Sequence, residues 1–85
     1  MARLTIQQEA IDLLLAGATP SELDEMEAGL RFCTTGISFR NGAWQVSPPV
    51  ARVLGGTPPS DALPRLERGI EVCRAARLLV SEKDR

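Results

Sequence analysis

The sequence predicts a small, mainly α-helical domain of four helices, built from two repeated αα-hairpins that a short β-hairpin links. Three observations predict it: a phrase that occurs twice, apolar residues at helical spacing in both copies, and an Asn-Gly pair between the copies. With 85 residues the chain is expected to be a single domain, 1–85. The first repeat unit covers about 5–33, the hairpin linker 36–46 and the second unit about 47–82.

The repeat relates "LAGATPSELDEMEAGLRFC" at 15–33 to "LGGTPPSDALPRLERGIEVC" at 54–73. In each copy a helix ends at a leucine, a glycine follows it in the left-handed position, and a Thr/Pro/Ser cluster opens the next helix. Each copy then carries four apolar residues at helical spacing, which we expect in the core: Leu23, Met26, Leu30 and Cys33, and Leu63, Leu66, Ile70 and Cys73. Gly29 and Gly69 are equivalent, and we expect each to face the other unit where the helices approach closely.

Capping signals place the helices. Thr5 with Gln8, and Thr19 with Glu22, form capping boxes that predict helices over about 5–16 and 20–33. A third helix, over 48–54, follows Ser47 with a proline at its first position. The last helix is expected over about 61–82, since a cap at Ser60 or Asp61 leaves Pro64 in the first turn.

The stretch at 37–46 has the alternation of two strands around Asn41-Gly42, which favours a tight hairpin. A two-stranded ribbon is unstable alone, so we expect Phe39 and Trp44 to pack against the helices. Trp44 has a second interpretation, as an anchor for a binding partner, with Arg40 near the ribbon tip beside it.

The net charge is −1, so no overall attraction to nucleic acid is expected. Residues 1–42 carry −3 and residues 43–85 carry +2. Most of the bases lie on the last helix, and we take four of them as candidate contacts with a partner: Arg65, Arg68, Arg74 and Arg77. This face is either a solvated helix surface, one half of a pairing between unlike halves, or a surface for an acidic partner.

Catalysis is not expected. The chain has no His, which removes the commonest general base and metal ligand, and two cysteines cannot complete a structural zinc site. We therefore expect no enzyme activity, no cofactor and no metal. The acids at 22–27 suit a helix N-terminus. Cys33 and Cys73 are expected to be buried thiols, with a disulfide as the alternative in an oxidising compartment.

Neither a membrane segment nor a secretory signal is expected. No apolar run approaches the roughly 18 residues that span a bilayer, and Gln7, Gln8 and Glu9 interrupt the N-terminal stretch. We therefore expect a cytoplasmic protein.

The stretch "EAIDLLLAGATPSELDEM" resembles the start of a helix-turn-helix DNA-binding unit. The resemblance covers about eighteen residues and implies a DNA-binding transcriptional regulator. The second helix, which would enter the major groove, carries four acids and one base, Arg31, so its charge is unsuited to phosphate. In this interpretation the basic last helix, or the ribbon with Arg40, would meet DNA instead.

The stretch "DALPRLERGIEVCRAARLLVSE" is similar to the last helix of exonuclease VII small subunits. The agreement lies in Leu63, Glu67, Gly69, Ile70 and Cys73 and covers a quarter of the chain. It implies a small accessory subunit of a nuclease. The ribbon at 37–46 has no counterpart in that family.

The function best suited to these features is that of a non-enzymatic protein-interaction module. It would bind and regulate a larger protein or nucleoprotein complex, or inhibit it as a phage or mobile-element accessory protein does, and would form a homo-oligomer, most simply a dimer. Binding of nucleic acid is the alternative. The two differ in their response to salt, because phosphate contacts weaken steeply as salt rises.

Overall fold

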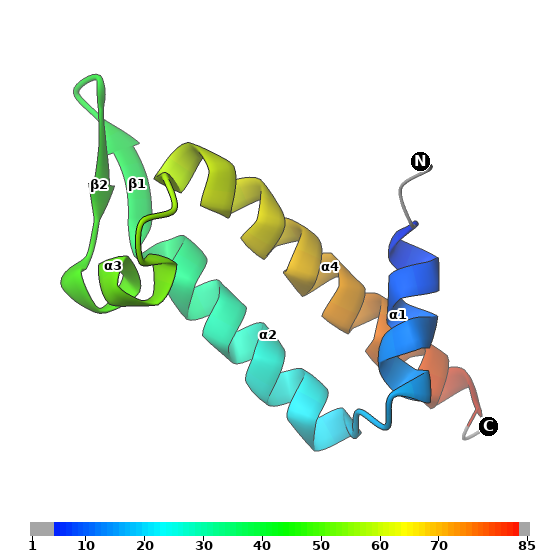
Figure 1. Cartoon of the computed structure of the whole chain (residues 1–85). Coiled ribbons are helices and arrows are strands. Elements are labelled where there is room, and N and C mark those ends of the chain that lie inside the picture. The colour runs from blue at the N-terminus through cyan, green and yellow to red at the C-terminus, as the bar shows by residue number, and fades with distance from the viewer. Residues whose placement is uncertain (1–4, 84–85) are drawn as a thin grey trace.

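The computed structural model describes residues 5–83, which form four helices and a two-stranded antiparallel hairpin (Figure 1). The elements are α1 (Ile6–Leu15), α2 (Pro20–Thr35), β1 (Ile37–Arg40), β2 (Ala43–Val46), α3 (Pro48–Leu54) and α4 (Pro59–Lys83). The predicted mainly α-helical class, with the hairpin between the second and third helices, is confirmed.

The first two helices begin at side chains that satisfy free backbone donors. Thr5 Oγ1 accepts a 3.1 Å hydrogen bond from the Gln8 N–H at the start of α1. Thr19 Oγ1 accepts one of 3.2 Å from the Glu22 N–H and donates one of 3.0 Å to the Glu22 carboxylate. These caps fix where each helix starts, which is why the sequence located both starts closely.

The start of α4 differs from the prediction. The helix begins at Pro59, two residues before the expected start at 61, and the N–H groups of Asp61 and Ala62 both donate to the Pro58 carbonyl at 3.0 Å. Pro64 therefore lies inside the helix rather than in its first turn. Pro64 has no N–H to donate to the Ser60 carbonyl, so one helical hydrogen bond is missing. The helix accommodates this loss because Pro64 lies within two turns of the N-terminal end of α4.

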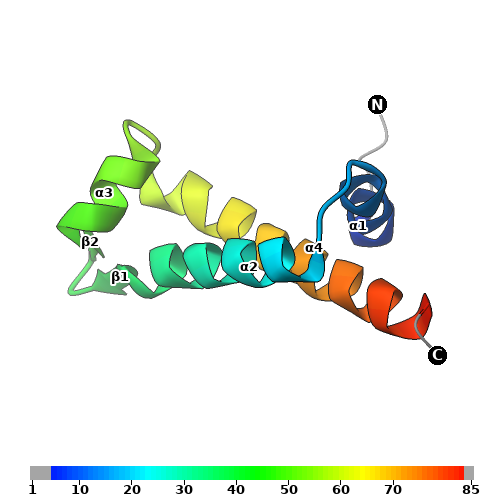
Figure 2. The same ribbon diagram turned by 90° about the horizontal axis from the view of Figure 1, so that it is seen from below.

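The two long helices, α2 and α4, run antiparallel side by side (Figure 1). Both short helices lie on the same side of this pair, one near each end (Figure 2). The first helix of each unit packs mainly on the long helix of the other unit, since α1 contacts α4 and α3 contacts α2. The repeat units are thus αα-hairpins by connectivity, but they are stabilised by exchanging their short helices rather than by closing on themselves.

Two apolar clusters result from this exchange. In the first, Ala10 of α1 packs with Ala76 and Leu23, and in the second, Val50 of α3 packs with Cys33 and Ile37. Ala76 and Gly36 are forty residues apart, the spacing of the repeat. A Cβ on Gly36 would overlap Val50 Cγ2 and lie 2.6 Å from Ser47 Oγ, so a small residue at each position admits the short helix of the other unit.

The β-hairpin has the turn that the sequence indicates. Asn41 and Gly42 both have positive φ, 54° and 75°, as a type I′ turn requires. Phe39 faces Trp44, and Arg40 faces Ala43 across the strands.

The residues expected in the core divide into three groups. Leu23, Cys33 and Cys73 are buried, and four others are half-buried: Leu30, Leu63, Leu66 and Ile70. Met26 is 43% exposed, so its assignment to the core was wrong. It lies on the uncovered part of α2 between α1 and α3, where no third helix closes over the pair.

The expectation for the two equivalent glycines holds at one of them. A Cβ on Gly69 would lie 2.9 Å from Leu30 Cδ1, which shows that α2 and α4 approach closely there. A Cβ on Gly29 would meet nothing within 4 Å, so the prediction for Gly29 was wrong. The two units therefore differ in helix packing at these equivalent glycines.

Candidate functional site

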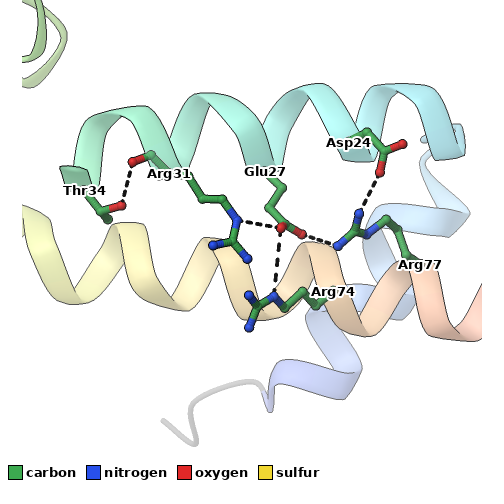
Figure 3. A network of polar contacts seen from close by, with 6 residues as sticks. All are labelled: Asp24, Glu27, Arg31, Thr34, Arg74 and Arg77. Carbon is green, nitrogen blue, oxygen red and sulfur yellow. Dashed lines mark hydrogen bonds and ion pairs between the residues drawn. The ribbon is translucent and has the colours of Figure 1, made fainter. Parts of the chain in front are cut away.

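One face of the α2–α4 pair carries a network of ion pairs centred on Glu27 (Figure 3). The Glu27 carboxylate lies 2.8 Å from Arg31 Nε on its own helix, and 2.5 Å from Arg77 Nη2 and 3.9 Å from Arg74 Nε on α4. Arg77 also donates to Asp24 at 2.7 Å. The network thus joins the acidic first half of the chain to its basic last helix.

Glu27 is 7% exposed and is the buried charge at the centre of this network. The hydrogen bond from Arg31 lowers the pKa of Glu27; burial acts in the opposite direction, and the charges of Arg77 and Arg74 lower it further. The hydrogen bond to Asp24 raises the pKa of Arg77, so Arg77 and Glu27 both remain charged at neutral pH. Because three arginines lower the pKa of Glu27 more than burial raises it, Glu27 has the surroundings of a structural ion pair rather than of a general acid or base.

The other predicted contacts on α4 are only partly available. Arg68 is a third ion-paired arginine of α4, because its Nη2 atom lies 2.7 Å from Glu9 Oε2 on α1. Arg65 is exposed and makes no ion pair with any residue in 5–83. Three of the four candidate arginines are therefore ion-paired within the chain, although Arg74 is 53% exposed and lies 3.9 Å from a carboxylate that it shares with Arg31 and Arg77.

The β-hairpin presents one wholly apolar face. Residues at alternate positions share a face, so Ile37, Phe39, Trp44 and Val46 lie together, while Arg40 lies on the opposite, polar face. Ile37 and Val46 belong to the second core cluster. The outer two residues extend the same face beyond the helices, which places an apolar surface in solvent.

The expectation that Phe39 and Trp44 pack against the helices was wrong. Phe39 is 59% exposed and Trp44 is 41% exposed. The two rings contact each other edge to face, with centroids 5.0 Å apart and planes at 64°. Such a pair stiffens the ribbon without a helix beneath it. The interpretation of Trp44 as a partner anchor stays a prediction.

A second surface is a groove of about 610 Å³, bordered by α1 and with the α2–α4 pair as its floor. Its apolar floor includes Met26, Leu30, Gly69 and Val72. Its charged residues lie at the walls, with Glu9 and Asp12 on α1 and Arg65 and Arg68 on α4. No cluster of polar groups converges within this floor, so the groove lacks the arrangement that fixes a small molecule for reaction.

The two cysteines are free and buried, and they lie at different levels of the molecule. Cys33 packs with Leu63 and Leu66, whereas Cys73 is about 10 Å further along α4 than Leu66 at 1.5 Å per residue. A disulfide needs Cα atoms within about 7 Å, so this fold does not bring the two together. Among residues 5–83 no group of three or more side chains is arranged to hold a metal ion.

Sequence reasoning missed the two groups that organise these surfaces. In the sequence Glu27 is one of several acids near a helix N-terminus, whereas in the structure two of its partners, Arg74 and Arg77, lie about fifty residues away on α4. The opposite charges of the two halves were the signal that could have paired them. Asp12 and Glu9 were not singled out, because nothing in the sequence indicates that α1 lies across α4.

None of the helices within residues 5–83 combines the length and apolar character that a bilayer crossing requires. No family model matches the chain, and no curated protein or solved structure is significantly similar to it.

Proposed function

We propose that this chain is a non-enzymatic protein-interaction module that binds a larger protein, or the protein part of a nucleoprotein complex, and regulates or inhibits it. The observation that carries the proposal is the exposed apolar face of the β-hairpin, where Phe39 and Trp44 lie in solvent as an extension of the second core cluster. Preformed pairs of large aromatic residues are typical centres of protein interfaces, because they bury much apolar area at little entropic cost.

The chemistry of this face defines the partner. An apolar strip two residues wide suits an apolar surface patch on a folded protein, and Arg40 on the opposite face of the hairpin is available to an acidic group at the edge of that patch. Catalytic activity is not part of the proposal, because the buried acid is held by arginines and no His is present to exchange protons near neutral pH.

The DNA-binding alternative has less support. Arg68, Arg74 and Arg77 are occupied by carboxylates of α1 and α2. The helix that corresponds to the recognition helix of a helix-turn-helix unit, α2, packs along its length against α4 and presents acids to solvent. Freeing the arginines for phosphate would require breaking these ion pairs first.

The experiment compares proteins captured from a lysate of the source cells by the wild-type chain, the double variant Phe39→Ser/Trp44→Ser, and Phe32→Ser. Phe32 is a matched control, because it is also an aromatic residue and is 58% exposed, but it belongs to the last turn of α2 and not to the apolar face of the hairpin. A protein captured by the wild type and by the control, and lost with the double variant, is expected.

Direct binding is then measured with that protein in purified form. Trp44 is the only tryptophan, so its emission reports the environment of the hairpin. A blue shift on binding is expected, because the ring moves from water into an interface. Equal capture by all three chains, capture of nothing, or an unchanged emission spectrum in the purified complex would each refute the proposal.

A further inference from the structure

The chain exposes more surface than a compact domain of its size. Its accessible surface is 6134 Å², whereas a folded monomer of 9.2 kDa exposes about 4,900 Å². Its radius of gyration is 14.7 Å, against about 12 Å for 85 residues. The surplus of about 1,200 Å² exceeds the roughly 800 Å² per partner that a stable protein interface buries. The fold therefore has enough uncovered surface for one further chain.

The groove beside α1 is one part of this surface. It lies on the side of the α2–α4 pair from which α1 and α3 both project (Figure 2), so α1 forms a ridge along its border. Ala10 is buried, so the residues on the opposite side of α1 form the outer side of this ridge. By helical spacing these residues are Gln8, Asp12 and Leu15. Leu15 is 80% exposed, the highest fraction among the large exposed apolar side chains of the described residues.

We infer that the groove is the self-association site of this chain, and that it receives the α1 ridge of a second copy in a two-fold symmetric dimer. The ridge and the groove lie on the same side of the molecule, so a two-fold axis places each ridge in the other groove. Leu15 of one copy then covers the apolar floor around Met26 and Leu30 of the other. One two-fold symmetric contact therefore fills the groove of each copy with the α1 ridge of the other.

The charges agree with this arrangement. Asp12, on the part of the α1 ridge that borders the groove, accepts a 3.0 Å hydrogen bond from the Gln8 side-chain amide, but it makes no ion pair with any residue in 5–83, and neither does Arg65 on α4. Glu9 and Arg68, in contrast, are paired with each other within one chain. In a two-fold dimer the Asp12 of each copy meets the Arg65 of the other, which makes the surface self-complementary. A groove with an acid on one side and a base on the other, neither of them in an ion pair within residues 5–83, is suited to a second copy of itself.

Light scattering during gel filtration of the full chain tests the inference. The wild type is expected to have about twice the mass of 9.2 kDa at micromolar concentration. The variants Asp12→Lys and Arg65→Glu, each alone, place like charges together at both contacts and are expected to elute as monomers. An equimolar mixture of the two restores both attractive contacts, so a heterodimer is expected.

A second pair of variants tests the apolar contact between Leu15 and the groove floor, and neither variant changes a charge. Leu15→Gln is expected to weaken the dimer at least tenfold, because a large apolar side chain remains in water. The matched control is Leu78→Gln, which removes a leucine that is 65% exposed beside Arg74 and Arg77, away from the groove, and is expected to leave the dissociation constant unchanged. All four positions are exposed, so none of these changes removes a core contact.

A monomeric wild type at every concentration would overturn the inference, and so would a mixture of the charge variants that stays monomeric or equal effects of the two leucine changes. These outcomes are separate from those of the proposed function. The latter depends on Phe39 and Trp44 at the far end of the molecule from α1 (Figure 1), and Trp44 emission is not expected to change on dimerisation.

Discussion

Glu27 of α2 and Arg77 of α4 form a 2.5 Å ion pair that joins the two halves of the chain (Figure 3). The pair lies in a network in which two acids of the first half face two arginines of the second. Its arginines are partly exposed, whereas the Glu27 side chain is only 10% exposed. Breaking the pair at Glu27 therefore leaves the arginines able to reach water, which limits the cost.

Glu27→Gln is expected to lower the free energy of unfolding by about 1–2 kcal/mol at pH 7, the range for a hydrogen-bonded charge with solvated partners. The folded protein lowers the pKa of Glu27 below its ordinary value of 4.5, mainly through the Arg31 hydrogen bond. A lowered pKa contributes stability above the unfolded value, which is lost as the pH falls through the folded value. Urea unfolding of both chains at pH 7 and at pH 3 measures this difference.

The difference between wild type and Glu27→Gln is expected to shrink at the lower pH. Glu25→Gln is the matched control, because Glu25 is exposed on the same helix without an ion pair to any residue in 5–83, and it is expected to change stability by less than about 0.5 kcal/mol. Equal effects of the two changes at pH 7, or a constant difference at all pH values, would show that the network does not stabilise the fold.

Gly29→Ala is expected to stabilise the protein by about 0.5–1 kcal/mol, because alanine favours the helix and its Cβ would meet nothing within 4 Å. The same change at the equivalent Gly69 brings a Cβ to 2.9 Å from Leu30 Cδ1, so Leu30 must move and the gain is expected to be cancelled. Thermal unfolding of the two single variants gives the comparison. A larger stabilisation at Gly69 than at Gly29 would contradict the close approach of α2 and α4 at that level.

Both thiols are expected to react with a thiol-specific reagent roughly 100-fold more slowly in the native protein than in urea, since the protein must open to expose them. Burial raises the pKa of Cys73, and the Glu27 charge raises it further, which reduces its reactive thiolate form. Mass spectrometry after mild air oxidation is expected to show two free thiols. A rapid native reaction of Cys73, or a Cys33–Cys73 disulfide formed without unfolding, would show that the α2–α4 register is incorrect.

The elements were predictable because their signals are local. Thr5, Thr19 and Ser47 mark helix starts within a few residues, and Asn41-Gly42 requires backbone that only a tight turn uses. The start of α4 was predicted two residues late, because Pro64 was assumed to need a place in the first turn. In the structure Pro64 lies in the second turn of α4.

The surfaces were less predictable because they depend on contacts between distant segments. An apolar stripe identifies the inward face of a helix but not the stretch of it that a third helix covers, so Met26 was assigned to the core. Strand alternation placed Phe39 and Trp44 on one face, but not whether a helix lies beneath it. The ion pairs of α4 span about fifty residues, and only the unequal charges of the two halves hinted at them.

The account depends on the ion pairs that hold Arg68, Arg74 and Arg77 of α4 within the chain, which leave the exposed aromatic face of the hairpin as the proposed binding surface. A titration of fluorescent duplex DNA with the wild-type chain across a salt series, starting near 50 mM, tests this most directly. The account predicts no binding at the lowest salt even at tens of micromolar protein, within the range where nonspecific DNA-binding proteins associate. Micromolar binding that falls steeply as salt rises would contradict it, because it would show that these arginines are free to meet phosphate.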